Sequence, residues 1–126
     1  MGSRLVTLKV RADFLRVAAA RRRVAVPGLV LQAAPRPPGL EGSGPRVGFT
    51  ASRKVGNAVL RNRAKRRLRG AAAEILAKQG NPGTDYVLIA RSETVARSYR
   101  ALCDDLAAAV HRVGGAGRRR RAAQEG

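Results

Sequence analysis

The chain has 126 residues, of which 26 are Lys or Arg and 8 are Asp or Glu, so its formal net charge is +18. This length suits one domain with tails and excludes two separate hydrophobic cores. Such a charge favours a polyphosphate partner, with an anionic membrane as the main competitor, and no apolar run approaches the roughly 20 residues that span a bilayer.

The first third of the chain predicts a helix followed by a strand. Residues 13–22 place Phe14 and Val17 on one helical face, with Asp13 as the expected N-cap. Residues 24–34 are rich in Val and Leu and stop before Pro35, as a strand would. A Pro- and Gly-rich segment at 35–45 predicts a long mobile loop that joins this strand to the next one as a hairpin.

The middle and the end of the chain predict two more strands and two long helices. Residues 46–53 alternate, with Val47 and Phe49 on one face and Thr50 and Ser52 on the other, which indicates a strand with one open face. A strand is expected at 85–90 and a helix from about Ser98. Gly114–Gly117 should end that helix, and Arg118–Arg121 should lie in a disordered tail over residues 114–126. The resulting fold class is a single-domain α+β sandwich over residues 1–113.

Residue types suited to catalysis are scarce. His111 is the only histidine, and Cys103, the only cysteine, lies in an Ala- and Leu-rich helical pattern that predicts a small buried side chain. Asp104 and Asp105 are adjacent in a helix, so their carboxylates point about 100° apart and form no acid–base pair. The sequence therefore predicts no catalytic side chain, no metal site and no small-molecule cofactor. The N-terminus lacks a signal peptide, and we expect a soluble cytoplasmic protein.

The most unusual segment is the stretch KVGNAVLRNRAKRRLR at residues 54–69. Asn57 is the expected N-cap of a helix whose apolar positions recur at Leu60, Ala64, Leu68 and Ile75. In the nine positions 61–69, seven are Arg, Lys or Asn, and no acidic residue comes before Glu74.

A helix that tolerates this repulsion among like charges is expected to meet a polyanion. A merely solvated basic face is the simpler alternative, although mixed Glu and Lys would provide it without repulsion. The excess of Arg over Lys suits bidentate phosphate contacts, but the base composition of the gene would explain it equally well. With 3% aromatic residues, no surface of several stacking platforms is predicted.

This segment resembles the signature of the protein subunit of bacterial ribonuclease P, in which an R-N-R core follows a K-x-G-N-A-V run. The resemblance covers roughly residues 5–113, and it includes Asp13-Phe14, the run 45–48 and the run 85–91. It implies the order α-β-β-β-α-β-α and a ribosomal-protein-like sheet with a left-handed βαβ crossover. The additional strand would come either from a division of the 24–34 segment or from a different use of the segment nearby. It also implies a ribonucleoprotein endonuclease whose RNA subunit catalyses removal of the 5′ leader from precursor tRNA, with Mg²⁺ bound mainly by that RNA.

The resemblance assigns residues to two surfaces. A surface for the catalytic RNA would comprise Arg53, Lys54, Asn57, Arg61, Asn62, Arg63, Lys65, Arg66 and Arg69. A cleft for the precursor tRNA leader would comprise Phe14, Val30, Gln32, Thr50, Ser52 and Lys54.

Three alternatives to these assignments stay open or are disfavoured. Ala18 and Gln32 stand where the family often has aromatic residues, so leader stacking should be weaker here, and Phe14 could instead belong to the core. A structural RNA-binding protein of the ribosome is the alternative function. A membrane-surface protein is disfavoured because no apolar face accompanies the basic one.

Overall fold

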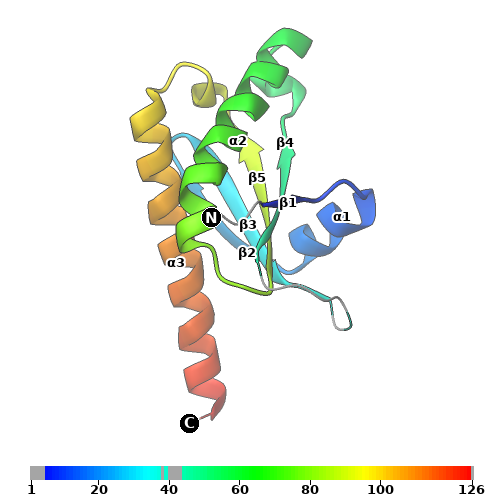
Figure 1. Ribbon diagram of the computed structural model, residues 1–126, viewed down its shortest axis with the longest axis vertical. Coiled ribbons are helices and arrows are strands. Elements are labelled where there is room, and N and C mark those ends of the chain that lie inside the picture. Colours follow the sequence, from blue (N-terminus) through cyan, green and yellow to red (C-terminus); the bar gives the residue numbers. More distant parts are fainter. Residues whose placement is uncertain (1–4, 38, 40–43, 126) are drawn as a thin grey trace.

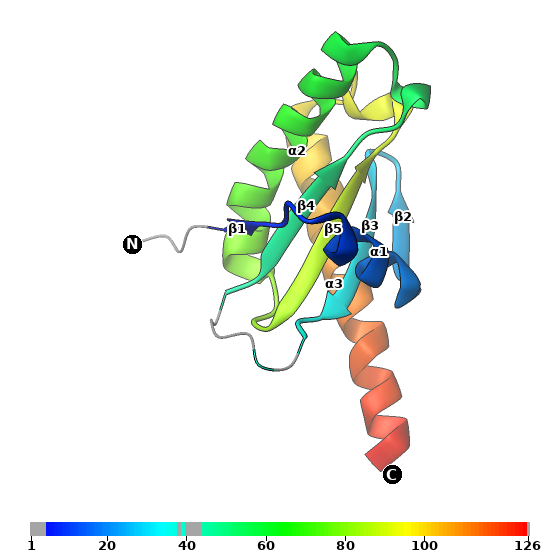
Figure 2. The same ribbon diagram turned by 90° about the vertical axis from the view of Figure 1, so that its right-hand side faces the viewer.

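The structure, a computed structural model, describes residues 5–37, 39 and 44–125, with side chains up to residue 114. Three layers make up the fold: two long helices, a five-stranded sheet and one short helix (Figures 1 and 2). The helices are α1 (Arg11–Ala19), α2 (Ala58–Gln79) and α3 (Tyr99–Glu125), with short 3-10 turns η1 (Arg53–Val55) and η2 (Ser92–Thr94). The strands are β1 (Val6–Thr7), β2 (Arg22–Val26), β3 (Leu29–Pro35), β4 (Arg46–Thr50) and β5 (Thr84–Ala90).

The sheet has the strand order β1-β4-β5-β3-β2. Strands β4 and β5 pair in parallel, whereas β3 pairs antiparallel with both β5 and β2. In Figure 2, β4 and β5 both run upward, α2 lies behind them and β5 lies to the right of β4, so the β4-α2-β5 crossover is left-handed. The α+β class and the left-handed crossover are thus confirmed, in contrast to the strong right-handed preference of such units. The two-residue strand β1 was not predicted.

The larger core lies between the sheet and the pair α2 and α3. Leu68 and Leu76 of α2, Tyr86 of β5 and Leu106 of α3 are each fully buried there. The helix begins as the sequence predicts, because the Oδ1 atom of Asn57 accepts a hydrogen bond of 3.0 Å from the backbone N–H of Leu60. These contacts confirm that the apolar stripe of α2 faces the sheet.

A smaller core lies on the opposite face of the sheet, under α1. Val17 is fully buried against Leu8, Ala34 and Val87, and Phe14 packs at its border. Helix α1 covers only part of this face, as the right-hand side of the molecule in Figure 1 shows.

The start of the first helix differs from the prediction. Helix α1 begins at Arg11 after Val10, which makes no side-chain cap, and it ends at Ala19. Asp13 therefore lies in the first turn and not at the N-cap. Its carboxylate forms an ion pair of 3.2 Å with Arg16.

The predicted single strand at 24–34 is divided into β2 and β3, which is one of the two possibilities that the family resemblance implied. Pro27 lacks an N–H for a sheet ladder, and Gly28 turns closely against α3, where its N–H donates to Asp105 Oδ2 at 3.0 Å. The predicted hairpin between this segment and β4 is wrong, because β5 lies between β3 and β4. Of the 35–45 loop, residues 38 and 40–43 lie outside the described residues.

Two element ends also differ from the predictions. Strand β4 stops at Thr50 instead of continuing to Arg53, because Ser52 caps the 3-10 turn η1 that begins at Arg53. Helix α3 does not end at the predicted stop Gly114–Gly117 but continues to Glu125. The disorder predicted for residues 114–126 stays a prediction. The division of the chain at residue 113 stays a prediction.

Candidate RNA-binding surfaces

The turn before α2 aims the basic segment away from the sheet. The Ser52 hydroxyl accepts a hydrogen bond of 3.3 Å from the Lys54 N–H and so closes η1. Gly56 then adopts a φ of 142°, a region that suits glycine alone, and a Cβ atom there would lie 2.5 Å from Leu60 Cδ1. Asn57 caps α2 directly after this turn, and the first cation of the helix, Arg61, follows four residues later.

The basic face of α2 consists of Arg61, Asn62, Arg63, Lys65, Arg66 and Arg69. Asn62, Arg63, Arg66 and Arg69 are exposed, while Arg61 and Lys65 are half-buried. Within the described part of the chain, no cation of this face forms an ion pair. Arg53, Lys54 and Asn57 are also exposed and lie just before it. Nine residues were predicted to contact RNA, and the structure places all of them at one end of the molecule. No acidic side chain among the described residues neutralises their charge.

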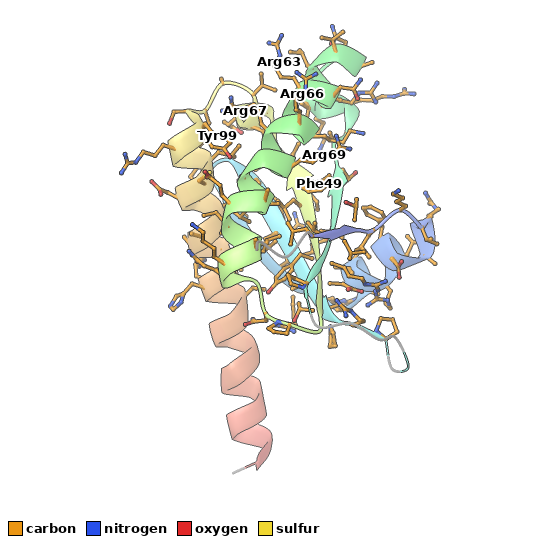
Figure 3. All side chains as sticks on the ribbon, viewed as in Figure 1. Phe49, Arg63, Arg66, Arg67, Arg69 and Tyr99 are labelled. Atoms are coloured by element: carbon orange, nitrogen blue, oxygen red, sulfur yellow. The ribbon has the colours of Figure 1, made fainter. Side chains whose placement is uncertain are left out.

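Two arginines of the same segment have partners within the protein. Arg67 donates from Nε to the Thr94 carbonyl at 3.0 Å and from Nη2 to the Arg97 carbonyl, which ties η2 and the following loop to α2. The guanidinium of Arg69 lies over the Phe49 ring at 5.6 Å from its centroid, a cation–π contact (Figure 3). Arg67 therefore has a structural role, and Phe49 supports Arg69 from the sheet.

Three of the residues predicted to form the leader cleft, Val30, Gln32 and Thr50, lie on the sheet face that carries α1. Register places Gln32, Val87 and Gly48 in one row across β3, β5 and β4. The next row is Val30, Ile89 and Thr50 in the same three strands. Cross-strand partners point to the same face of a sheet, so this alignment joins Val30, Gln32 and Thr50 on one surface.

These predicted residues differ in how much surface they present. Val30 is only 6% exposed, so it offers little to a ligand, whereas Gln32 and Thr50 are half-buried. Phe14 is also half-buried, because its ring lies over Gly48, where a Cβ atom would be 2.6 Å from Phe14 Cζ. Phe14 therefore belongs to the smaller core and still keeps part of its ring accessible. Ser52 and Lys54 are exposed beyond the end of β4, and the roles of all six stay predictions.

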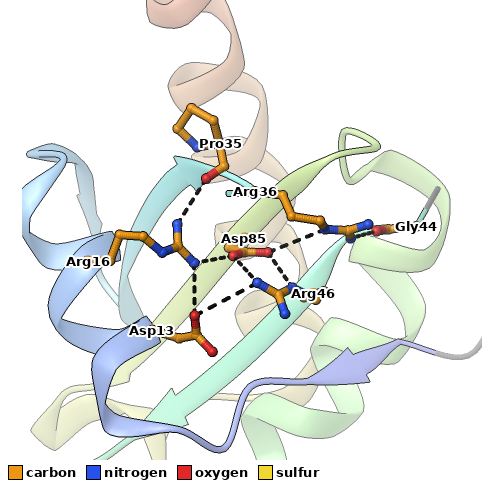
Figure 4. A network of polar contacts seen from close by, with 7 residues as sticks. All are labelled: Asp13, Arg16, Pro35, Arg36, Gly44, Arg46 and Asp85. Atoms are coloured by element: carbon orange, nitrogen blue, oxygen red, sulfur yellow. Dashed lines mark hydrogen bonds and ion pairs between the residues drawn. The ribbon is translucent and has the colours of Figure 1, made fainter. Parts of the chain in front are cut away.

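A buried carboxylate fixes α1 relative to this face. Asp85, which starts the buried part of β5, has no exposed surface and accepts hydrogen bonds from Arg46 Nε at 2.8 Å and Arg46 Nη2 at 2.6 Å. Arg16 of α1 also donates to Asp85 and donates to the Pro35 carbonyl at 2.9 Å, and Arg36 Nε lies 3.8 Å from Asp85 (Figure 4). One carboxylate thus connects α1, β4, β5 and the end of β3.

Charge balance keeps Asp85 ionised. Burial by itself would raise the pKa of Asp85, but hydrogen bonds and charge from Arg46 and Arg16 outweigh it, so the pKa is lowered. The same contact with Asp85 raises the pKa of Arg46. Sequence reasoning missed this network; the only available signal was an acidic residue at the start of an otherwise apolar strand.

The protein residues do not fit a magnesium site. Within the described residues there is no group of three His, Cys, Asp or Glu side chains that could hold a metal ion. Asn57 uses its Oδ1 atom to cap α2, and Mg²⁺ prefers carboxylate, phosphate and water oxygens to neutral amides. Nor is any helix in the described ranges both long and apolar enough to cross a membrane.

Comparison with known proteins identifies the family of this chain. The family model described as Ribonuclease P matches residues 3–114. The chain belongs to this family. The ribonuclease P protein component of Paramagnetospirillum magneticum is 56% identical over 115 residues, which cover 90% of this chain and 86% of the relative. That of Ruegeria pomeroyi is 52% identical over 112 residues, which cover 88% of each chain.

A solved structure supports the ribonuclease P family fold. The ribonuclease P protein of Staphylococcus aureus superposes with a TM-score of 0.66 at 26% identity, over 86% of this chain and 94% of that one. Membership of this family favours a ribonuclease P component over the alternative of a structural protein of the ribosome.

Proposed function

We propose that this protein is the protein subunit of a ribonuclease P ribonucleoprotein, and that it assists the removal of the 5′ leader from precursor tRNA. The single observation that carries the proposal is the basic face of α2, whose cations form no ion pair within the described residues. In this role the protein binds the catalytic RNA of the holoenzyme. The reaction places it in the cytoplasm, where precursor tRNA is processed in bacteria.

The basic face of α2 contributes charge neutralisation. Arg63 and Arg66 are exposed on the helix surface, and a guanidinium can hold a phosphate by two parallel hydrogen bonds. Neutralising phosphates where RNA strands converge lowers the repulsion that opposes folding of the catalytic RNA and reduces its requirement for Mg²⁺. No group of three possible metal ligands occurs among the described residues, and we assign Mg²⁺ to the phosphates of the RNA, which it prefers as ligands.

The sheet face beside α1 contributes contacts to the leader. Gln32 and Thr50 supply polar side chains from β3 and β4, and the half-buried Phe14 supplies part of one aromatic ring. Exposed Lys54 lies between this face and α2, so one strand of RNA could pass from the leader surface to the basic face. The absence of an aromatic side chain at Gln32 predicts weak stacking and little preference among leader bases.

Reconstitution tests the proposal directly. The protein is mixed with a bacterial ribonuclease P RNA and a precursor tRNA at low Mg²⁺, and leader removal is compared with that by the RNA alone. An increase in rate is expected. A rate equal to that of the RNA alone would refute the proposal.

Salt dependence tests the role of the basic face. The double variant Arg61→Ala/Arg66→Ala removes two phosphate contacts, so the slope of log binding constant against log salt concentration should become shallower by roughly 1.5. The matched control is Lys78→Ala/Arg112→Ala, which removes two exposed charges, one in the last turn of α2 and one on α3. This variant should leave the slope unchanged. Equal slopes for the first variant and the wild type would locate the RNA contact elsewhere.

A further inference from the structure

Tyr99 differs from the other three aromatic side chains of this protein. Tyr86 is fully buried, Phe14 lies over Gly48, and Phe49 lies under Arg69. Tyr99 is 41% exposed, at the first residue of α3. The protein therefore presents one exposed aromatic ring, and neither the basic face nor the leader surface described above includes it.

The exposed ring is held in place from one side. A Cβ atom at Gly70 of α2 would lie 3.2 Å from the Tyr99 hydroxyl oxygen and 3.3 Å from Cε1, so the absence of a side chain there lets the ring lie against α2. Desolvation, together with Cys103 and Glu74 beside the hydroxyl, raises the pKa of Tyr99 to about 12. The ring thus lies with its hydroxyl edge close to α2 at Gly70. A ring fixed in this way loses little conformational freedom when a ligand covers it.

Several arginines lie at the end of α2 next to the ring, while Glu74 is the acidic neighbour of its hydroxyl. Arg63, Arg66 and Gly70 follow one another at i, i+3 and i+7 and so share one face of α2. Figure 3 shows Arg63, Arg66, Arg67 and Tyr99 at the same end of the molecule, where Arg67 ties the segment before α3 to α2. Arg100, the next residue after Tyr99, is exposed as well.

An open ring flanked by arginines matches the chemistry of an unpaired nucleotide. The base provides a flat face for the ring, and its phosphates provide charge for the guanidinium groups. Paired bases cannot offer that face, because they are stacked within a helix. An acidic protein surface would satisfy the arginines but would leave the ring without a flat partner.

We propose that Tyr99 is a stacking platform for one unpaired nucleotide of the RNA that binds the basic face of α2. This inference rests on the function proposed above and specifies which element of the RNA this end of the protein recognises: a bulged or looped nucleotide next to phosphates held by Arg63 and Arg66. The catalytic RNA is the source to which we assign it, because Tyr99 adjoins α2 and not the sheet face beside α1.

Substitution separates stacking from charge and from packing. With ribonuclease P RNA, Tyr99→Leu should weaken binding about tenfold at every salt concentration, because it removes a stack and no charge, so the salt slope stays unchanged. Tyr99→Phe keeps the ring and should bind within about twofold of the wild type. Leu15→Ala, at an exposed apolar position on α1, is the control. Wild-type affinity of Tyr99→Leu would overturn the inference.

A fluorescent variant tests the contact itself. The chain contains no tryptophan, so Tyr99→Trp introduces a single reporter, and Leu15→Trp provides the matched control on α1. Ribonuclease P RNA should quench the first and leave the second unchanged, whereas precursor tRNA alone should quench neither. Quenching of Tyr99→Trp by precursor tRNA alone would overturn the assignment to the catalytic RNA, and no quenching by either RNA would overturn the stack. If the wild-type protein bound no RNA, the proposed function itself would fail; wild-type binding with an unaffected Tyr99→Leu refutes only the inference.

Discussion

Asp85→Asn should destabilise the protein by about 3 kcal/mol. Removing one partner of a buried ion pair typically costs about 3–5 kcal/mol. Asp85 has no exposed surface, but the side chains of Arg16 and Arg46 are 30% and 18% exposed, so water can partly solvate them after the change. The lower end of the range therefore applies.

Equilibrium urea unfolding measures this loss. With a slope of about 1.5 kcal/mol per molar urea, a loss of about 3 kcal/mol lowers the midpoint by roughly 2 M. Asp104→Asn, at an exposed position, is the matched control and should change the midpoint little. A loss below about 1 kcal/mol for Asp85→Asn would show that the network does not hold α1 to the sheet.

The pH dependence of the unfolding free energy of the wild type and of Asp85→Asn gives a second check on the role of Asp85. Its pKa in the folded state lies below the ordinary value of 3.8, so the unfolded state takes up a proton first as the pH falls. The stabilisation by the ionised carboxylate is complete above the ordinary value and disappears as the pH falls through the lowered one. The difference in unfolding free energy between the wild type and Asp85→Asn should therefore be constant near neutral pH and shrink below about pH 4. A difference that grew on acidification would contradict this reasoning.

Two further substitutions test single contacts by urea unfolding. Asn57→Ala removes the hydrogen bond of 3.0 Å that caps α2 and should cost about 1 kcal/mol, whereas Asn62→Ala, at an exposed position in the helix, should cost little; equal losses would count against the cap. Gly48→Ala places a Cβ atom 2.6 Å from Phe14 Cζ and should cost about 1–3 kcal/mol as the ring is displaced from the sheet, whereas an unchanged midpoint would show that α1 adapts without strain.

Elements with a strong local pattern were predictable from the sequence. The apolar stripe of α2 and its cap at Asn57 depend on residues close in the chain, and the structure confirms them. The alternation in β4 likewise predicted that Val47 and Phe49 face one core while Thr50 faces the other side.

Features that depend on distant partners could not be predicted from local patterns. The position of β5 between β3 and β4 follows from the α2 crossover, and residues 24–50 alone favoured a simple hairpin. The sequence around Asp13 favours a helix cap, whereas in the structure Asp13 lies within the first turn and forms ion pairs with Arg16 and Arg46. Nor did the sequence show that Arg67 would bind carbonyl groups of another segment while its neighbours stay exposed.

The distribution of the few acidic residues explains how a chain of net charge +18 both folds and keeps a basic surface. Asp85 neutralises Arg16 and Arg46 where α1 meets the sheet, and Asp105 pairs with Arg97 beside the turn between β2 and β3. Both carboxylates thus serve arginines at the contacts between elements, where an unpaired charge would be costly. The basic face of α2 receives no such partner among the described residues, so its repulsion persists in the isolated protein, and the proposed binding of RNA would relieve it.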